Sequence, residues 1–592
     1  MKTSLLTLFL AVSLVAPAQT GPEAPELASF ERSVLALLAK YQIPGAAVAI
    51  AKDRRLVYTR GFGVADVTTN EPVQPDSLFR VASVSKPITG MAVLKLVEEG
   101  KISLDTKVLA YVGRTAAADP RYADITVRHL LQHSAGLDIE FWEFDPTFPD
   151  RATLDALGAD LPPDRAAVLD FILENLPLAS APGERYAYSN VGFLLLTDVI
   201  EKASGQAYET YMREKILAPL GIQRMRIAGS LLTDRQPGEV RYWDKDRTGT
   251  PIFAGLPKES PSVYGTFNIR IFESGGGWLA SMPDLVRFLV ALDGNSLLRP
   301  ETARLITERP AYVQAGDDSW YGLGWGIVNT RFGFRWDHDG ALPGTAAWVF
   351  RGVNGVSFAI AANHLPDNEL LLAFFEEVQS GLGASLLATS NWPAGDLFPS
   401  YFPGGGPRIA TGGVVNAASL RPGPVAAGSA VTLFGVNLAG QPVRVNGTLV
   451  EPLWSGPDQV TVQVPLSAQG NARFEVGGSR AETAMVRDSA PGIFTNSRNG
   501  YGAAAALNQD GSANSAERPA EAGSVIVIFA TGVGFPPSVT VAGQPAEVLF
   551  AGPAPGLPAG VQQINLRLPA GLTPGAAKLS LGVPSEVTVA VR

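Results

Sequence analysis

The 592-residue sequence contains no cysteine and only four histidines. Without thiols the chain can form no disulfide bond, so its stability has to come from packing. His129 and His133 lie four residues apart, but no His-Glu-x-x-His pattern accompanies them. Because zinc sites are built mainly from cysteine and histidine, this composition argues against a metal site. We predict neither a metal nor any other cofactor.

Basic residues are also scarce: 47 Lys and Arg stand against 56 Asp and Glu, which gives a net charge of -9. A nucleic-acid-binding protein needs clustered positive charge, and none is present, so no nucleic-acid partner is expected. Charged residues make up 17% and hydrophobic residues 46% of the chain, which indicates a globular protein without long disorder. This length predicts roughly two to four domains.

Long hydrophobic runs are missing apart from one at the start of the chain. Lys2 precedes an apolar stretch from residue 5 to 15, which is shorter than the roughly 20 residues that a membrane-spanning helix needs. Ala16-Pro17-Ala18 then offers the small residues of a cleavage site. We therefore predict a signal peptide over residues 1–18 and an exported protein, periplasmic or secreted. The alternative is a retained N-terminal anchor, and no later transmembrane segment is predicted.

The most informative stretch is residues 81–90, which contains the only Ser-x-x-Lys pattern in the chain. The residues after it have apolar positions at helical spacing, so Ser83 and Lys86 are expected on one face of a helix start. A serine hydroxyl becomes a good nucleophile when a base takes its proton. A lysine can be that base when burial or a nearby cation keeps its pKa well below about 10.4. The alternative is a helix-capping serine followed by a surface lysine.

Two further motifs follow Ser83 along the chain. Tyr188-Ser189-Asn190 supplies a tyrosine whose pKa a lysine ammonium would lower, and an amide that could orient Lys86 or a substrate. His338-Asp339-Gly340 lies near the end of a predicted strand, where the imidazole could donate to a substrate oxygen and the glycine could let a ligand approach the strand edge. The alternatives are a buried tyrosine that closes a loop and an exposed histidine in a turn.

The order of the expected elements predicts an α+β fold, with an antiparallel sheet flanked by helices plus a helical region. Helices are predicted near 24–41, 166–175, 191–204, 206–216, 282–292 and 369–387, and strands at 45–52, 56–63, 321–328, 332–338, 345–351 and 356–362. Because strands stand at both ends with helices between them, the N- and C-terminal strands should pair in one sheet. Residues 138–180 and 232–273 are expected to be largely irregular.

Together the three motifs resemble the serine β-lactamase and penicillin-binding-protein superfamily, most of all its class C-like branch, which includes family VIII esterases and D-aminopeptidases. Residues 129–137 and 275–278 are similar to further segments of that branch. The resemblance implies an acylated serine, an activating lysine, a tyrosine that passes the proton to the leaving group, a positioning asparagine and two backbone N–H groups that form an oxyanion hole. These are Ser83, Lys86, Tyr188 and Asn190, with the N–H groups of Ser83 and Ala341. Whether Lys86 or Tyr188 is the base stays open.

One position departs from that family pattern. Typical β-lactamases carry Lys-Thr-Gly where this chain has His338-Asp339-Gly340. The lysine is a permanent cation that helps to hold the carboxylate of a β-lactam, whereas a histidine is mostly neutral at pH 7. We therefore expect an exported serine hydrolase that forms an acyl-enzyme on Ser83, acting on esters, small peptides, D-amino-acid amides or β-lactams, with weak β-lactamase activity. The alternative is a catalytically weak or inactive protein that binds cell-wall peptides.

The composition changes after residue 395. We predict a hydrolase domain over 22–395, a Pro/Gly linker over 396–411, and two β-sandwich repeats over 412–495 and 496–592. The repeat is visible because residues 427–434 (AGSAVTLF) match residues 522–529 (AGSVIVIF). This tail resembles the Solibacter-type C-terminal domain of many secreted acidobacterial proteins and immunoglobulin-like modules. The resemblance implies attachment or spacing, with the cell wall as a candidate partner.

Overall fold

A computed structural model describes residues 18–148, 162–244, 247–293, 297–402, 407–456, 459–479, 481–498, 500–583 and 585–592. The predicted signal peptide lies outside these residues except for Ala18, whose carbonyl accepts the N–H of Gly63 at 2.8 Å. Strand β1 (Gln19–Thr20) then pairs with β3 (Arg55–Asp66). The chain directly after the predicted cleavage position is therefore held in the sheet.

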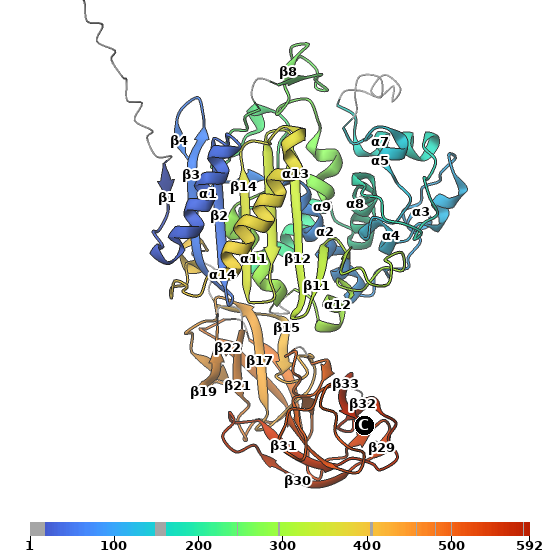
Figure 1. Ribbon diagram of the computed structural model, residues 1–592, viewed down its shortest axis with the longest axis vertical. Coiled ribbons are helices and arrows are strands. Elements are labelled where there is room, and N and C mark those ends of the chain that lie inside the picture. The colour runs from blue at the N-terminus through green and yellow to red at the C-terminus, as the bar shows by residue number, and fades with distance from the viewer. Residues whose placement is uncertain are drawn as a thin grey trace, which may run out of the picture.

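A nine-stranded sheet forms the centre of the N-terminal part (Figure 1). Its main path runs β1-β3-β2-β14-β13-β12-β11-β10, with β4 paired to β3. Strand β2 (Gly45–Lys52) pairs antiparallel with β14 (Val356–Ala362), so strands from the two ends of this part meet in one sheet, as the α+β prediction requires. The remaining strands are β4 (Glu71–Pro72), β10 (Ser319–Tyr321), β11 (Gly326–Thr330), β12 (Gly333–Leu342) and β13 (Thr345–Arg351).

The two faces of this sheet pack against different helices because the side chains of a strand alternate between faces. In β2, Val48 and Ile50 join the core that lies under α1 (Ala28–Lys40), α13 (Asn368–Glu377) and α14 (Gly383–Ala388). The alternating alanines of β2 face the other core, where α11 (Met282–Asp293) packs on β2 and β14. Small side chains on that face let α11 lie close to the sheet.

The helical stretch from Glu369 to Ala388 differs from the expectation that no later segment could cross a membrane. It is 20 residues long and contains an 18-residue window with a mean hydropathy of 1.3, so its length and composition alone would allow a membrane span. Phe374, Val378, Leu382 and Leu386, each four residues after the last, are buried in the core beside the sheet. In this structure the stretch serves as a packing helix whose apolar stripe covers one face of the sheet.

One predicted strand is broken in a way that matters for the site. Residues 321–328 were expected to be continuous, but β10 and β11 are separated by Gly322–Trp325, where the N–H of Gly322 donates to the Trp325 carbonyl at 2.8 Å. Gly324 has a φ of +85° and lies against the carbonyl of Lys86, where an added Cβ would be 3.1 Å away. The break therefore brings this turn onto the helix that carries Lys86.

The helical region contains short helices with connecting loops. They are α2 (Ser85–Glu98), α3 (Val108–Val112), α4 (Val127–Leu131), α5 (Ile139–Trp142), α7 (Arg165–Asn175), α8 (Asn190–Ser204), α9 (Tyr208–Met212), α10 (Glu273–Gly276) and α12 (Pro300–Leu305). Predicted helices 166–175 and 191–204 agree with α7 and α8. The predicted helix over 206–216 is α9 followed by a π-helical turn at Arg213–Leu217.

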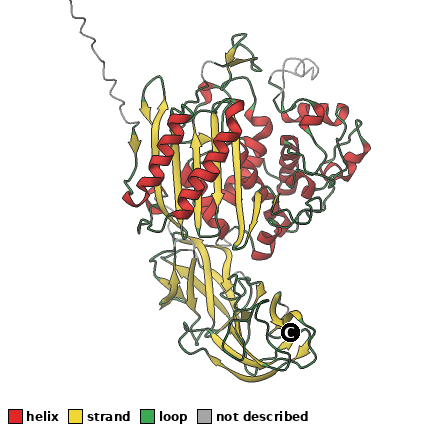
Figure 2. Cartoon of the chain, in the orientation of Figure 1, coloured by secondary structure: helices red, strands yellow, loops and turns green. Residues whose placement is uncertain are grey.

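The C-terminal region is built from strands, as Figure 2 shows below the mixed N-terminal part. Its first half pairs as β15-β17-β21-β20 and β16-β23-β22-β18-β19, and its second half as β24-β27-β31-β30 and β25-β33-β32-β28-β29. The bounds of the shorter or flanking strands are β15 (Arg408–Asn416), β16 (Val425–Ala426), β18 (Val443–Val445), β19 (Thr448–Val450), β20 (Pro452–Ser455), β22 (Asn471–Val476), β23 (Glu482–Arg487), β24 (Gly492–Ile493), β25 (Gly502–Ala503), β28 (Thr540–Val541), β29 (Gln544–Pro545), β30 (Glu547–Pro553), β32 (Gly575–Ser580) and β33 (Val587–Val591). These orders correspond strand by strand, which supports the internal repeat predicted from the sequence. The two halves also have separate apolar cores. Principal strands are β17 (Ala430–Val436), β21 (Gln459–Gln463), β27 (Val525–Thr531) and β31 (Gln562–Arg567).

The predicted linker over 396–411 is partly folded. Phe398, in the short helix α15 (Phe398–Tyr401), and Phe402 are buried in the main core of the N-terminal part. The guanidinium of Arg287 lies 4.8 Å and 5.5 Å from these two rings. The next strand, β15, already begins at Arg408. Burial of these two aromatic rings is favourable because it removes apolar surface from water. This segment therefore packs on the core and does not stay solvated as a linker.

Candidate active site

Ser83 comes to the surface from an otherwise buried stretch. Within residues 81–90 it is the one residue that is not fully buried. It lies in a single 3-10 turn, Ala82–Val84, directly before α2. Ala82 has a φ of +47°, which is uncommon for a residue with a side chain, and the N–H of Val81 is fixed by the Trp278 carbonyl at 3.0 Å. The chain is thus constrained to present the Ser83 hydroxyl.

Lys86 is fully buried, and its ammonium nitrogen has three neighbours. Nζ lies 3.0 Å from Ser83 Oγ, 2.8 Å from Asn190 Oδ1 and 2.9 Å from the Gly275 carbonyl. Burial lowers the pKa of Lys86 to about 7, although the charges of Asp145 and Asp339 oppose the shift. A neutral amine has two hydrogens and one lone pair. Because the amide and carbonyl oxygens can only accept, the lone pair is left for the Ser83 O–H.

Asn190 is held in place by a carboxylate that sequence reasoning missed. Its Nδ2 donates to Asp145 Oδ2 at 2.9 Å, so the Oδ1 atom has to face Lys86. The other oxygen of Asp145 accepts the N–H of Thr147 at 2.9 Å and its hydroxyl at 2.6 Å. Asp145 comes from the Pro- and Asp-rich segment 138–180, whose lack of periodicity gave no signal for this contact.

Tyr188 also interacts with Ser83, through a hydrogen bond between the two side chains. Its ring lies 4.8 Å from Lys86 Nζ. Burial raises the pKa of Tyr188 well above its usual value. This is opposite to the lowered pKa expected from the sequence, because burial of the phenol outweighs the nearby amine. At neutral pH Tyr188 is therefore a hydrogen-bond donor.

His133 packs against the segment that contains Tyr188. Its Nδ1 accepts the N–H of Ser189 at 3.1 Å, and its ring centroid lies 4.3 Å from that of Tyr188 and 4.5 Å from that of Tyr321. Burial lowers its pKa well below the ordinary value. A neutral imidazole that accepts at Nδ1 carries its proton on Nε2. His133 thus packs as an uncharged ring.

His338 does not offer the donor that the sequence suggested. Its Nδ1 lies 2.5 Å from the Asp339 carbonyl, which can only accept, and its Nε2 lies 2.8 Å from the Tyr321 hydroxyl. The imidazole therefore donates through Nδ1 and accepts from Tyr321 through Nε2. Burial lowers its pKa to about 4, so it is neutral at pH 7. With both ring nitrogens engaged, His338 keeps no free N–H for a substrate oxygen.

Gly340 is needed for a close approach of protein to protein, rather than of ligand to strand. A Cβ there would lie 2.4 Å from the Val81 carbonyl and 3.1 Å from the Ser83 nitrogen. Strand β12 thus rests directly on the Ser83 turn. In β12 the pairing with β11 ends at Asp337, so the strand edge beyond it is open. The backbone N–H groups along a strand point alternately to its two sides. Those of Arg335 and Asp337 point toward β11, so the N–H of Ala341 points toward this open edge.

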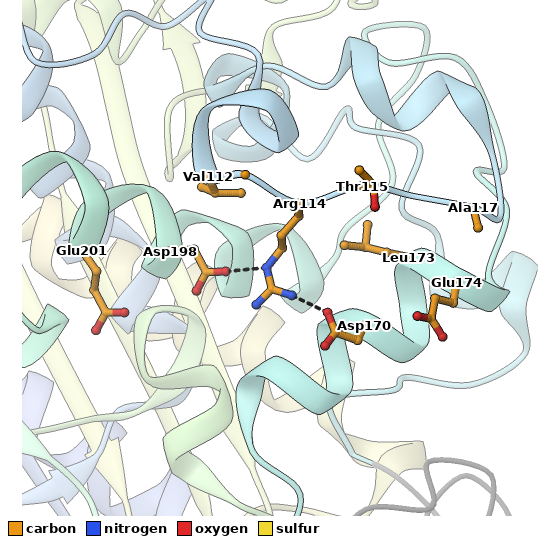
Figure 3. A pocket seen from close by; sticks show the side chains of 10 residues that line it. Val112, Arg114, Thr115, Ala117, Asp170, Leu173, Glu174, Asp198 and Glu201 are labelled. Carbon is orange, nitrogen blue, oxygen red and sulfur yellow. Dashed lines mark hydrogen bonds and ion pairs between the residues drawn. The ribbon is translucent and has the colours of Figure 1, made fainter.

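A large cavity of about 680 Å³ lies elsewhere, among α3, α7 and α8 (Figure 3). Its central cation, Arg114, is already paired with Asp198 at 3.0 Å and Asp170 at 2.5 Å. Glu174 and Glu201 add further negative charge to its lining. The cavity contains none of the residues around Ser83, and we do not place the active site there.

Comparisons with known proteins identify the family of the N-terminal part of the chain. The model of the family described as beta-lactamase matches residues 30–374, more than half of the chain. The chain belongs to the beta-lactamase family. The predicted membership of the wider superfamily is thereby confirmed, and the strand-rich C-terminal region lies outside the matched residues.

Curated relatives of this beta-lactamase-family protein carry different activities in their names. Penicillin-binding protein 4* of Bacillus subtilis is 28% identical over 53% of this chain and 66% of its own length. Esterase EstB of Burkholderia gladioli is 32% identical over 49% of this chain and 75% of its own length. The solved D-amino acid amidase of Ochrobactrum anthropi SV3 superposes with a TM-score of 0.49 at 21% identity, covering 61% of this chain and all of that one.

Proposed function

We propose that this beta-lactamase-family protein is an exported serine hydrolase that acts through an acyl-enzyme on Ser83, with esters and small peptides or D-amino-acid amides preferred over β-lactams. The contact between Lys86 and Ser83 supports this most strongly. Lys86 Nζ is buried 3.0 Å from Ser83 Oγ, and its two other neighbours can only accept hydrogen bonds. A neutral Lys86 is therefore oriented to take the serine proton.

The proposed acylation begins when Ser83 Oγ attacks the substrate carbonyl carbon while its proton passes to Lys86 Nζ. The bond to the leaving group then breaks, and the leaving atom takes a proton from the Tyr188 hydroxyl, which Lys86 restores. Water attacks the Ser83 ester in the second half and reverses the same transfers. In this scheme Lys86 is the base and Tyr188 the proton relay, because burial lowers one pKa and raises the other.

The oxyanion hole is assigned to the backbone N–H groups of Ser83 and Ala341. Gly340 brings β12 against the Ser83 nitrogen, and Ala341 directs its N–H toward the same open edge. Donors fixed before the reaction stabilise the developing charge without reorganisation, by roughly 3–4 kcal/mol each. In this scheme His338 takes no part in proton transfer. Its ring hydrogen-bonds the Tyr321 hydroxyl and the Asp339 carbonyl and keeps both in position.

The decisive test combines turnover with labelling of the purified protein. We expect hydrolysis of p-nitrophenyl acetate and butyrate, weaker turnover of nitrocefin, and a fluorophosphonate adduct found by peptide mass spectrometry on Ser83. The Ser83→Ala variant should lose both the adduct and the activity. Labelling without turnover of any ester, amide or β-lactam would instead favour the cell-wall peptide-binding alternative, and nitrocefin turnover that rivals the esters would contradict the substrate preference.

The pH dependence of kcat/KM should follow the protonation of Lys86. Lys86 works as a base only when it is unprotonated, and its pKa is about 7. We therefore expect kcat/KM to fall roughly tenfold per pH unit below about pH 6 and to level off above about pH 8. Initial rates with p-nitrophenyl acetate, corrected for spontaneous hydrolysis, would measure the profile. A flat profile between about pH 5 and 8 would contradict a titrating Lys86 base.

A further inference from the structure

The charges around Ser83 are unbalanced. Lys86 could balance negative charge only when it is protonated, and it is fully buried and engaged by three oxygens. Asp145 and Asp339 both act electrostatically on it. The arginines that precede Tyr188 and His338 in the sequence by three residues are paired with carboxylates. Arg185 donates to Asp138 at 2.6 Å, and Arg335 donates to Asp337 at 3.1 Å.

Asp339 differs from Asp145 because it is open to solvent. Its residue is exposed, while His338 and Gly340 on either side are buried. It lies just beyond the end of the pairing between β11 and β12, next to the glycine that contacts the Ser83 nitrogen. Within the described part of the chain, Asp339 forms no ion pair with a lysine, arginine or histidine, whereas Asp138 and Asp337 each pair with an arginine. Its charge is therefore exposed at the open edge of β12, beside the turn that carries Ser83.

The influence of this carboxylate extends over the whole site. Its field acts on Lys86, on His338 and on the three tyrosines that pack around the His133 ring, Tyr186, Tyr188 and Tyr321. His338, the one titratable cation candidate beside it, is neutral at pH 7. A substrate carboxylate near the open edge would meet Asp339 with no opposing mobile cation, whereas an ammonium group would be attracted.

We propose that Asp339 is a specificity residue that selects substrates by charge, so that acyl groups carrying an ammonium group are preferred and those carrying a carboxylate are rejected. This inference rests on the proposed serine hydrolase activity and names its substrate class. It places β-lactams and peptides with a free terminal carboxylate among poor substrates. Amino-acid esters and amides with a free amine belong to the preferred class.

The test uses p-nitrophenyl esters of three acids of matched length, which end in a trimethylammonium, a tert-butyl or a carboxylate group. The leaving group is constant, so differences in kcat/KM report the charge of the acyl group. Rates are measured near pH 8, where Lys86 is unprotonated, because loss of Asp339 also changes the field on Lys86. We expect the cationic ester to exceed the anionic ester by about 30-fold or more at low salt, and this ratio to shrink at about 0.5 M salt.

Three variants assign the effect to one residue. Asp339→Asn should reduce the cation-to-anion ratio at least tenfold, and Asp339→Lys should invert it. The control Asp105→Asn removes a carboxylate with 83% exposure that lies outside the site and should leave the ratio unchanged. The tert-butyl ester corrects each variant for general loss of activity.

The outcomes separate the two proposals. Hydrolysis of the tert-butyl ester with equal rates for both charged esters, or a ratio that Asp339→Asn does not change, overturns charge selection and leaves the acyl-enzyme intact. Failure of all three esters together with no fluorophosphonate label on Ser83 overturns the proposed hydrolase, and charge selection with it.

Discussion

Replacing Lys86 by methionine is expected to lower kcat/KM for p-nitrophenyl acetate by roughly a thousandfold or more. Methionine fills a similar volume, so the buried space stays occupied, but it can neither take the proton of Ser83 nor donate to Asn190 Oδ1 and the Gly275 carbonyl. Ser83 would then have to react without a base. Steady-state kinetics at about pH 8 would measure the loss directly.

A matched control lies on the same helix. Lys95 in α2 is partly exposed and pairs with Glu98 at 3.2 Å, so Lys95→Met makes the same substitution in the same helix without touching Ser83. It should keep kcat/KM within a few-fold of the parent. Adding Lys86→Met to Ser83→Ala should cause little further loss, because groups that act as one unit are not additive. Activity of Lys86→Met within tenfold of the parent would instead assign the base to Tyr188.

Much of the fold could be predicted because it depends on local patterns. Strands β2, β13 and β14 have the predicted bounds, since each is an apolar run between turn residues. The motif around Ser83 could also be read directly, because nucleophile and base lie three residues apart at the start of one helix. The internal repeat was visible as repeated text and reappears as repeated strand order.

The parts that could not be predicted depend on contacts between distant segments. Asp145 reaches Asn190 across 45 residues, and Tyr321 meets His338 only because the strand breaks after it. The pKa of Tyr188 was expected to fall because a lysine lies nearby, but its direction is set by burial, which the sequence does not show. The same holds for His338, whose free nitrogen is lost to a tyrosine that no motif contains.

Gly340→Ala is expected to reduce kcat by roughly a hundredfold. The added methyl group would lie 2.4 Å from the Val81 carbonyl and 3.1 Å from the Ser83 nitrogen. Both neighbours are backbone atoms, so neither can rotate away, and β12 or the Ser83 turn has to shift. A displacement near 1 Å at the reacting atoms costs about a factor of 100. The overpacking should also lower the free energy of unfolding by about 1–3 kcal/mol.

Gly383→Ala provides the control, because it adds the same methyl group to a helical glycine whose nearest other atom, in the Trp348 ring, would be 3.8 Å away. That variant should keep its activity and be neutral or slightly more stable. Thermal unfolding and kinetics measured together separate two effects of Gly340→Ala. If strand β12 only braces the fold, stability falls and the kcat of the folded fraction is kept. If β12 carries half of the oxyanion hole, kcat falls even at temperatures where the variant is fully folded, since the N–H of Ala341 moves with the strand. Parent-like kcat in folded Gly340→Ala would therefore remove Ala341 from the proposed mechanism while leaving Ser83 and Lys86 in it.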